Sequence, residues 1–217
     1  YGVYLNDNRE RTPTPDDTKG WMFPDSPVMD VRVRRALSKA IDRDALNKAF
    51  FGGEGKPMFN AHFGTSRMGW NPTWEARFKD EYGYDQEAAR RLLTEAGYGP
   101  SKPMSINIEM QKPYGYTGGE DVAEAIAAMW RTVGIQPQLV SRDPADHMNQ
   151  RRQFKLNNHV VLNGTGSDQW TGVTTYGSTQ GSRPGGPELP DANKLLEQIA
   201  NTLDEKRQEE LWKQVGE

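Results

Sequence analysis

Residues 104–140 read MSINIEMQKPYGYTGGEDVAEAIAAMWRTVGIQPQLV, and this stretch decides the fold. Apolar residues occupy every second position across residues 104–110, which is the spacing of a strand with one buried face. Across residues 122–133 they recur at helical spacing, and Gly134 then offers a stop. Residues 135–140 return to strand character. The stretch therefore predicts a strand, a helix and a second strand.

The pattern continues beyond this stretch. Residues 144–151 favour a short helix, and residues 159–162 carry the β-branched residues of a third strand. Strands that alternate with helices are joined by right-handed crossovers, which place the helices on a mostly parallel sheet. We therefore expect an α/β fold with a largely parallel sheet flanked by helices, the architecture of a periplasmic-binding-protein-like lobe.

Helices are also expected on both sides of this unit. Asp30, Asp42 and Asp85 each precede an apolar stripe at helical spacing, so each can cap a helix. Near the end of the chain, one helix is predicted over residues 195–199. Another is predicted to begin with a capping box from Thr202 to Glu205.

Three segments lack a sustained period. Residues 1–29 are expected to be an extended N-terminal segment that includes a short strand over residues 1–5. Residues 53–84 are predicted to be a structured loop and the stretch from Leu162 to Pro190 one long loop. With no internal repeat, residues 1–217 are interpreted as a single α/β domain.

Composition excludes several classes of protein. The chain has 217 residues, 27 basic and 30 acidic side chains, a net charge of −3 and no cysteine. The missing thiols exclude disulfides and thiolate metal sites, and the near-neutral charge argues against nucleic acid as a partner. A mean hydropathy of −0.87, with no long apolar run, argues against a transmembrane helix.

Candidate binding residues follow the predicted strands. Ligands of open α/β sheets bind beyond the carboxyl ends of the strands, and the three loops expected there mix cations, acids and aromatic rings. That mixture suits a polar organic solute with a charged end. The candidates are Lys112, Tyr114 and Tyr116 in the first loop, Arg142 in the second, and Asp168, Trp170 and Tyr176 in the third. The alternative is that most of them are solvated loop residues.

Catalytic and metal signatures are weak. His62, His147 and His159 lie on separate segments without metal-binding spacing, so each is interpreted as structural or as a surface residue. The sequence contains no G-x-S-x-G motif for an activated serine. A glycan hydrolase, the enzyme alternative, would need two facing acids that no pattern here nominates. We therefore expect binding without turnover, metal or cofactor.

Three blocks of the sequence resemble family 5 of the extracellular solute-binding proteins, the dipeptide and oligopeptide receptors of ABC importers. Residues 30–46, DVRVRRALSKAIDRDAL, resemble the characteristic helical segment of that family. Residues 84–98 are similar to its next helix, and residues 122–135 resemble the helix before its second strand. The three blocks span most of residues 28–140.

The resemblance implies that this chain is the C-terminal lobe of a receptor that encloses its solute between two lobes. An N-terminal lobe and a signal peptide would then precede Tyr1. The implied partners are a peptide or related polar solute and an ABC permease in the membrane, and the implied location is periplasmic or extracellular. Two alternatives remain open: an oligosaccharide receptor of the same family, and the ligand-sensing module of a regulator.

The resemblance also singles out one residue. Peptide receptors of the family often carry Gly-Trp-x-Ala-Asp after a strand, and the resemblance implies that this Asp pairs with the amino terminus of the peptide. Gly164 and Asp168 keep the pattern, whereas Thr165 replaces the tryptophan. Asp168 is therefore the first candidate to bind a solute cation. The alternative is a turn aspartate that bonds to its own backbone.

Overall fold

The computed structural model describes residues 25–56, 58–60, 62–111, 118–153, 155–162, 168–177 and 190–217. Its elements in chain order are η1 (Pro27–Met29), α1 (Val31–Lys39), α2 (Arg43–Phe50), α3 (Thr73–Tyr82), α4 (Gln86–Glu95), β1 (Met104–Gln111), α5 (Gly119–Thr132), β2 (Ile135–Arg142), α6 (Pro144–Arg152), β3 (His159–Val161), α7 (Gln169–Gly177), α8 (Pro190–Ala200) and α9 (Glu205–Gly216). The predicted alternation of strand and helix from β1 to β3 is confirmed.

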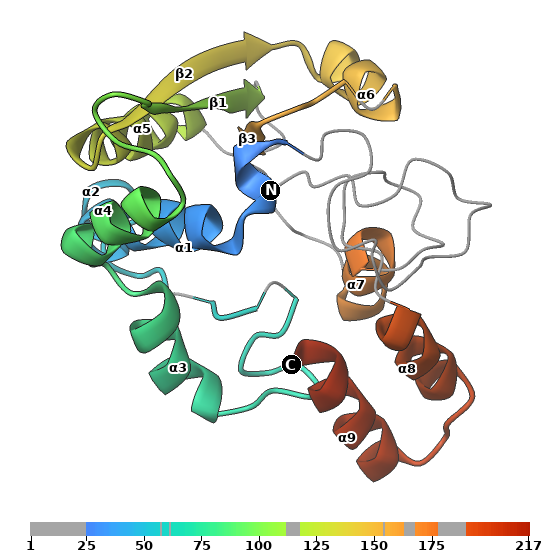
Figure 1. Cartoon of the computed structure of the whole chain (residues 1–217). Helices are drawn as coiled ribbons and strands as arrows, with labels where there is room; N and C mark the ends of the chain where they lie inside the picture. Colours follow the sequence, from blue (N-terminus) through green and yellow to red (C-terminus); the bar gives the residue numbers. More distant parts are fainter. Residues whose placement is uncertain are drawn as a thin grey trace.

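The three strands form one parallel sheet in the order β2-β1-β3. Ile108 of β1 is level with Leu139 of β2 and Val160 of β3. Figure 1 shows α1, α4 and α5 on the same side of this sheet, with α6 beyond the tip of β2. The predicted α/β class, with a parallel sheet flanked by helices, is confirmed.

The apolar face of the sheet forms the larger of two hydrophobic cores. Ile106 and Ile108 are fully buried on this face, and the core continues into α1, α4 and α5. Trp130 of α5 is buried in the same core, and its indole Nε1 donates a hydrogen bond of 2.9 Å to the carbonyl oxygen of Leu37 in α1. That bond satisfies the one polar group of a buried tryptophan, so α5 and α1 are joined by packing and by a hydrogen bond.

The three predicted aspartate caps are confirmed. The carboxylate of Asp30 accepts a hydrogen bond from the backbone N–H of Arg32, that of Asp42 from Ala45, and that of Asp85 from Ala88. Each bond satisfies an N–H group that has no partner inside its helix.

The prediction of two long loops is wrong in part, because each of the two segments contains a helix. The segment 53–84 contains α3, whose burial rests mainly on one residue, Trp74, so it shows little apolar periodicity. The segment 162–190 contains α7, with sequence QWTGVTTYG, in which β-branched residues and a glycine oppose a helix by propensity. Tertiary packing stabilises both helices where local sequence preference does not.

Two smaller expectations also need correction. Residues 27–29, expected to be extended, form the 3-10 turn η1. The predicted capping box from Thr202 is wrong, because Asp204 is the N-cap of α9. Its carboxylate accepts a hydrogen bond of 2.8 Å from the N–H of Arg207. Thr202 instead donates its hydroxyl to the carbonyl oxygen of Gln198. The expected strand over residues 1–5 lies outside the described residues.

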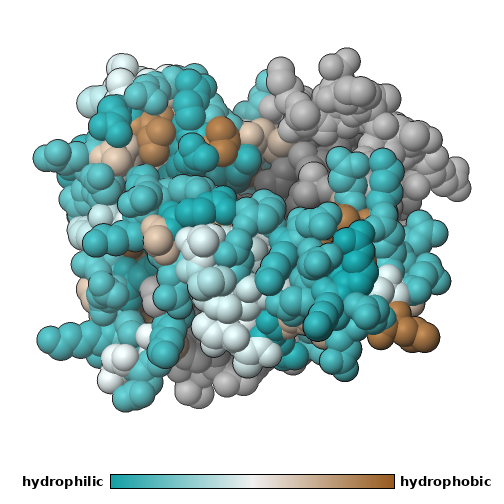
Figure 2. Space-filling model, turned by 90° about the horizontal axis from the view of Figure 1, so that it is seen from below, coloured by the Kyte–Doolittle hydropathy of each residue, from teal (hydrophilic) through white to brown (hydrophobic). Residues whose placement is uncertain are grey.

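The second hydrophobic core joins α3, α7, α8 and α9, which Figure 1 shows at a distance from the sheet. Its buried members are Phe63, Trp74, Val173, Leu196, Ile199, Leu211 and Trp212. The side chain of Glu217 closes this core, because its carboxylate accepts hydrogen bonds from the indole N–H of Trp74 and from Arg77. On the face drawn in Figure 2, hydrophobic residues form only small separate spots among hydrophilic ones.

Candidate functional site

The carboxyl ends of the three strands meet at one edge of the sheet, as the sequence predicts. Gln111 at the end of β1 is level with Arg142 at the end of β2, and Glu109 of β1 is level with Val161 of β3. Loops and helix N-termini converge at this edge, which is where open α/β sheets bind ligands.

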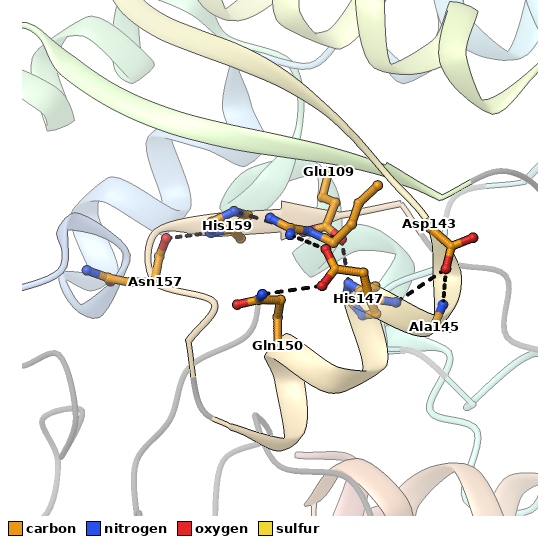
Figure 3. A network of polar contacts seen from close by, with 9 residues as sticks. Glu109, Asp143, Ala145, His147, Gln150, Asn157 and His159 are labelled. Atoms are coloured by element: carbon orange, nitrogen blue, oxygen red, sulfur yellow. Dashed lines mark hydrogen bonds and ion pairs between the residues drawn. The ribbon is translucent and has the colours of Figure 1, made fainter.

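A buried carboxylate lies at the centre of this edge. Glu109 is 0% exposed, and its Oε1 lies 2.6 Å from Nδ1 of His147 in α6 and 3.2 Å from Nε of Arg142 in β2. Its Oε2 makes no hydrogen bond among the described residues, and Nε2 of His159 in β3 lies 3.9 Å away. Figure 3 shows the residues that converge on Glu109 from β2, α6 and β3.

The histidine interpretation is therefore incomplete. His147 is 4% exposed and packs inside the fold, as a structural residue would, but it and His159 converge on one carboxylate. No single segment carries a signal for this cluster, because Glu109, His147 and His159 are far apart in the sequence. Within the described parts of the chain, no group of three or more acidic, histidine or cysteine residues could hold a metal ion.

Arg142, a predicted binding residue, lies at this edge, and its positive charge is already paired with acidic side chains. Its Nη1 donates to Oδ2 of Asp146 at 2.6 Å, in addition to the ion pair with Glu109. Gln150 donates to the other oxygen of Asp146. Two carboxylates therefore orient the guanidinium, whose side chain is 21% exposed. A solute could reach only the part of Arg142 that these acids leave open.

The charges around Glu109 set its protonation. Burial raises the pKa of this carboxyl, but the hydrogen bond from His147 and the charges of His147 and Arg142 outweigh burial and hold the pKa below its ordinary value. Since an unfolded glutamate has a pKa of about 4.3, the folded protein keeps this carboxylate ionised at a lower pH than the unfolded chain does.

This difference predicts an acid-sensitive stability. The contribution of Glu109 is fully present above the pKa of the unfolded chain and is lost as the pH falls through the lower pKa of the folded state. We expect the free energy of unfolding, measured by urea titration at pH 7, 5, 4 and 3, to fall with acid more steeply in the wild-type protein than in Glu109→Gln. Equal slopes in the two proteins would contradict a lowered pKa at Glu109.

Asp168 and Trp170, the second group of candidates, lie at the start of α7. Oδ1 of Asp168 accepts a hydrogen bond of 3.0 Å from the backbone N–H of Thr171, so this carboxylate caps the helix as the turn alternative anticipated. The hydrogen bonds, of which that from Thr171 N–H is the strongest, hold the pKa of Asp168 below its ordinary value, so the group is ionised at neutral pH. Its side chain is exposed to solvent.

Trp170 lies two residues after Asp168 on the same turn of α7. Its ring is 40% exposed and meets the buried ring of Trp212 edge to face, with the centroids 6.1 Å apart. The contact with α9 fixes the indole while leaving part of its surface open. An exposed acid and an exposed aromatic ring thus lie on the same helical turn, and each is a kind of group that can bind an organic cation.

The other candidates lie where side chains are not described. Lys112, Tyr114 and Tyr116 fall between residues 111 and 118, outside the described residues. Tyr176 lies on α7, but its side chain is also outside the description. The structure therefore brings Arg142 together with the Glu109 cluster, and it places Asp168 and Trp170 on the first turn of α7.

In the described parts of the chain, no helix is long and apolar enough to cross a bilayer.

Comparison with known proteins identifies one family and several relatives. The family model for bacterial extracellular solute-binding proteins, family 5 Middle, matches residues 1–187. The dipeptide-binding protein of Escherichia coli K12 is 29% identical over 204 residues, which cover 87% of this chain and 35% of that protein. Heme-binding protein A of Haemophilus influenzae is 29% identical over 134 residues, covering 60% of this chain and 23% of that protein. The chain thus spans about a third or less of the length of these relatives.

Solved structures agree on the fold. The structure of HbpA2 from Haemophilus parasuis has a TM-score of 0.72 at 23% identity, covering 89% of this chain and 38% of that chain. The Escherichia coli murein tripeptide binding protein MppA has a TM-score of 0.67 at 24% identity, with the same two coverages. At these identities the likeness shows the fold alone.

Proposed function

The chain belongs to the bacterial extracellular solute-binding proteins, family 5, and on that premise we propose that it is the C-terminal lobe of a two-lobed receptor for peptides or a related polar solute. The family consists of binding proteins and not of enzymes. In the proposed receptor an N-terminal lobe closes over the solute, and an ABC permease takes the solute into the cell. The location proposed for the receptor is periplasmic or extracellular.

One observation carries the solute class. Asp168 is ionised and exposed at the first turn of α7, the turn that also carries the exposed ring of Trp170. A carboxylate binds an ammonium group through charge, and an aromatic ring binds one through its face. The amino terminus of a peptide is such a group. Support for peptides also comes from relatives named as dipeptide-binding proteins, in Escherichia coli and in Pseudomonas aeruginosa.

The Glu109 cluster has a supporting role in this proposal. Glu109 and Asp146 carry two negative charges around the single positive charge of Arg142, so these three described residues together carry no excess of positive charge. An anionic solute would gain little there, whereas a zwitterion such as a peptide could present its ammonium group to Asp168 and its carboxylate elsewhere.

The test is the ligand that the whole receptor retains. We expect native mass spectrometry of the complete gene product, purified from its own host, to detect a short peptide that is released on denaturation. The released peptide should be intact, and L-alanyl-L-phenylalanine added in excess should also be recovered uncleaved. A retained sugar or heme would replace the peptide class. Cleavage that persists after repurification would overturn a receptor function.

A further inference from the structure

The first turn of α7 is held tightly by the loop that precedes α3. Gln169, the first residue of α7, is 8% exposed, and its side-chain amide donates a hydrogen bond of 2.8 Å to the carbonyl oxygen of Met68. The turn itself closes when the N–H of Gly172 donates to the carbonyl oxygen of Asp168 at 2.9 Å. Asp168 therefore sits on a turn whose position depends on residues 62–70.

His62 makes the closest approach in this contact. A Cβ atom on Gly172 would overlap the imidazole ring of His62, so only glycine fits between the ring and the helix. His62 also has a backbone φ of 71°, a left-handed conformation that residues other than glycine adopt uncommonly. Strained backbone of this kind persists where the surrounding structure requires it. The ring of His62 therefore packs directly against the turn that carries Asp168.

The same ring is coupled to Asp168 by charge. Burial lowers the pKa of His62, the positive charge of Arg67 lowers it further, and the negative charge of Asp168 opposes both. Among the described residues, the charges that shift the pKa of His62 are those of Arg67 in its own loop and Asp168 in α7. His62 is neutral at pH 7 and gains its charge only as the pH falls.

We propose that His62 is the positioning residue of Asp168: its ring sets where the first turn of α7 holds the carboxylate, and its charged form competes with a solute cation for that carboxylate. The inference rests on the proposed function, because it takes Asp168 to meet a cationic group of the solute. It adds a specific role for a histidine that does not itself touch the solute.

The packing half of the proposal is tested by a double-mutant cycle in the whole receptor. Gly172→Ala places a methyl group in the ring of His62, and we expect the melting temperature to fall by about 3 to 10 °C. His62→Asn keeps a residue that tolerates positive φ and makes space. The double variant should recover more than half of the loss. Gly99→Ala is the matched control, because nothing lies within 4 Å of its Cβ, and it should melt close to the wild type.

The charge half is tested by a pH profile. The affinity for L-alanyl-L-phenylalanine should fall by about threefold to fivefold as the pH falls from 7.5 through the lowered pKa of His62, as expected for one unit charge a few ångströms away in water. Asp168 stays ionised at pH 5, and the peptide amine, with a pKa of about 7.7 to 8.0, is mostly protonated at pH 7.5 and becomes fully protonated as the pH falls. In His62→Asn the fall in affinity should be absent. A wild-type slope in that variant, or additive effects in the cycle, would overturn the proposal.

A measurement without solute separates this inference from the proposed function. In the unliganded receptor labelled with ¹³C-aspartate, the carboxyl signal of Asp168 should shift as His62 titrates, and the shift should vanish in His62→Asn. If the dipeptide does not bind but this shift and the recovery in the double variant are present, the proposed function fails and the positioning role stands. If the dipeptide binds and neither is present, the positioning role fails alone.

Discussion

Replacing Glu109 with leucine should cost about 3 kcal/mol of unfolding free energy, which corresponds to a fall of roughly 6 to 12 °C in melting temperature. Glu109 is fully buried, and its removal deprives His147 of its hydrogen-bond acceptor and Arg142 of one of two acidic partners. Breaking a buried ion pair by removing one partner commonly costs about 3 to 5 kcal/mol of unfolding free energy. The remaining contact between Arg142 and Asp146 places the expected loss at the lower end of that range.

The control for this variant is the same change on the surface. Glu124 lies exposed on α5, so Glu124→Leu should alter the unfolding free energy by no more than about 0.5 kcal/mol. A second variant replaces Glu109 and its two nearest partners with apolar residues, through Glu109→Leu, Arg142→Met and His147→Leu together. It should recover more than half of the loss, since the cost comes from unpaired polar groups. Urea unfolding measures all three, and a Glu109→Leu protein within about 1 kcal/mol of the wild type would show that the network does not stabilise the edge.

The fold was predictable where local sequence and tertiary structure agree. Asp85 caps α4, and the apolar stripe that follows packs into the core around the sheet, so the cap and the stripe indicated the same helix. The strands β1 and β2 were predictable for a similar reason, because their alternating residues match one apolar face. In α3 and α7 local sequence and tertiary structure disagree. The buried tryptophan of α3 and a glycine of α7 are required by contacts with distant segments and give no helical pattern.

The positions of the candidate residues were predictable only approximately. Arg142 was expected in the loop after the second strand and is the last residue of β2, and Asp168 was expected in a long loop and lies at the start of α7. Glu109 gave no signal, because a single acid on the polar face of a strand is indistinguishable from a solvated residue until the partners are known. Its partners come from β2, α6 and β3, and only the parallel register brings them to one carboxylate. His62 was hidden for the same reason, because its contact is with a glycine more than a hundred residues away.

The two groups of candidate residues have different requirements. The Glu109 cluster is buried and internally paired, so its contribution is to hold β2, α6 and β3 in place. The side chain of Asp168 is exposed, and its carboxylate accepts a hydrogen bond from the N–H of Thr171 within the same turn. Loss of Glu109 should therefore appear mainly as lost stability, whereas loss of the charge of Asp168 should appear mainly as lost affinity.

Asp168→Asn in the whole receptor should weaken the binding of L-alanyl-L-phenylalanine by about 30-fold or more while leaving the unliganded melting temperature nearly unchanged. Asparagine caps helices about as well as aspartate, so the bond to Thr171 survives and only the charge is lost. Calorimetry with the free dipeptide measures the loss of affinity. The N-acetyl dipeptide, which lacks the ammonium group, should bind the wild type weakly and should lose no further affinity in Asp168→Asn.

Asp168→Ala completes this comparison, because it removes the cap together with the charge. It should match Asp168→Asn in affinity and melt at a lower temperature, since alanine is a poor N-cap. If Asp168→Asn binds the free dipeptide as tightly as the wild type does, the carboxylate serves α7 as a cap and nothing more. If both peptides lose affinity equally in Asp168→Asn, the change acts on the shape of the site and not on a charge pair with the ammonium group. The pairing of Asp168 with a solute cation therefore requires both results: a large loss for the free amine and none for the acetylated one.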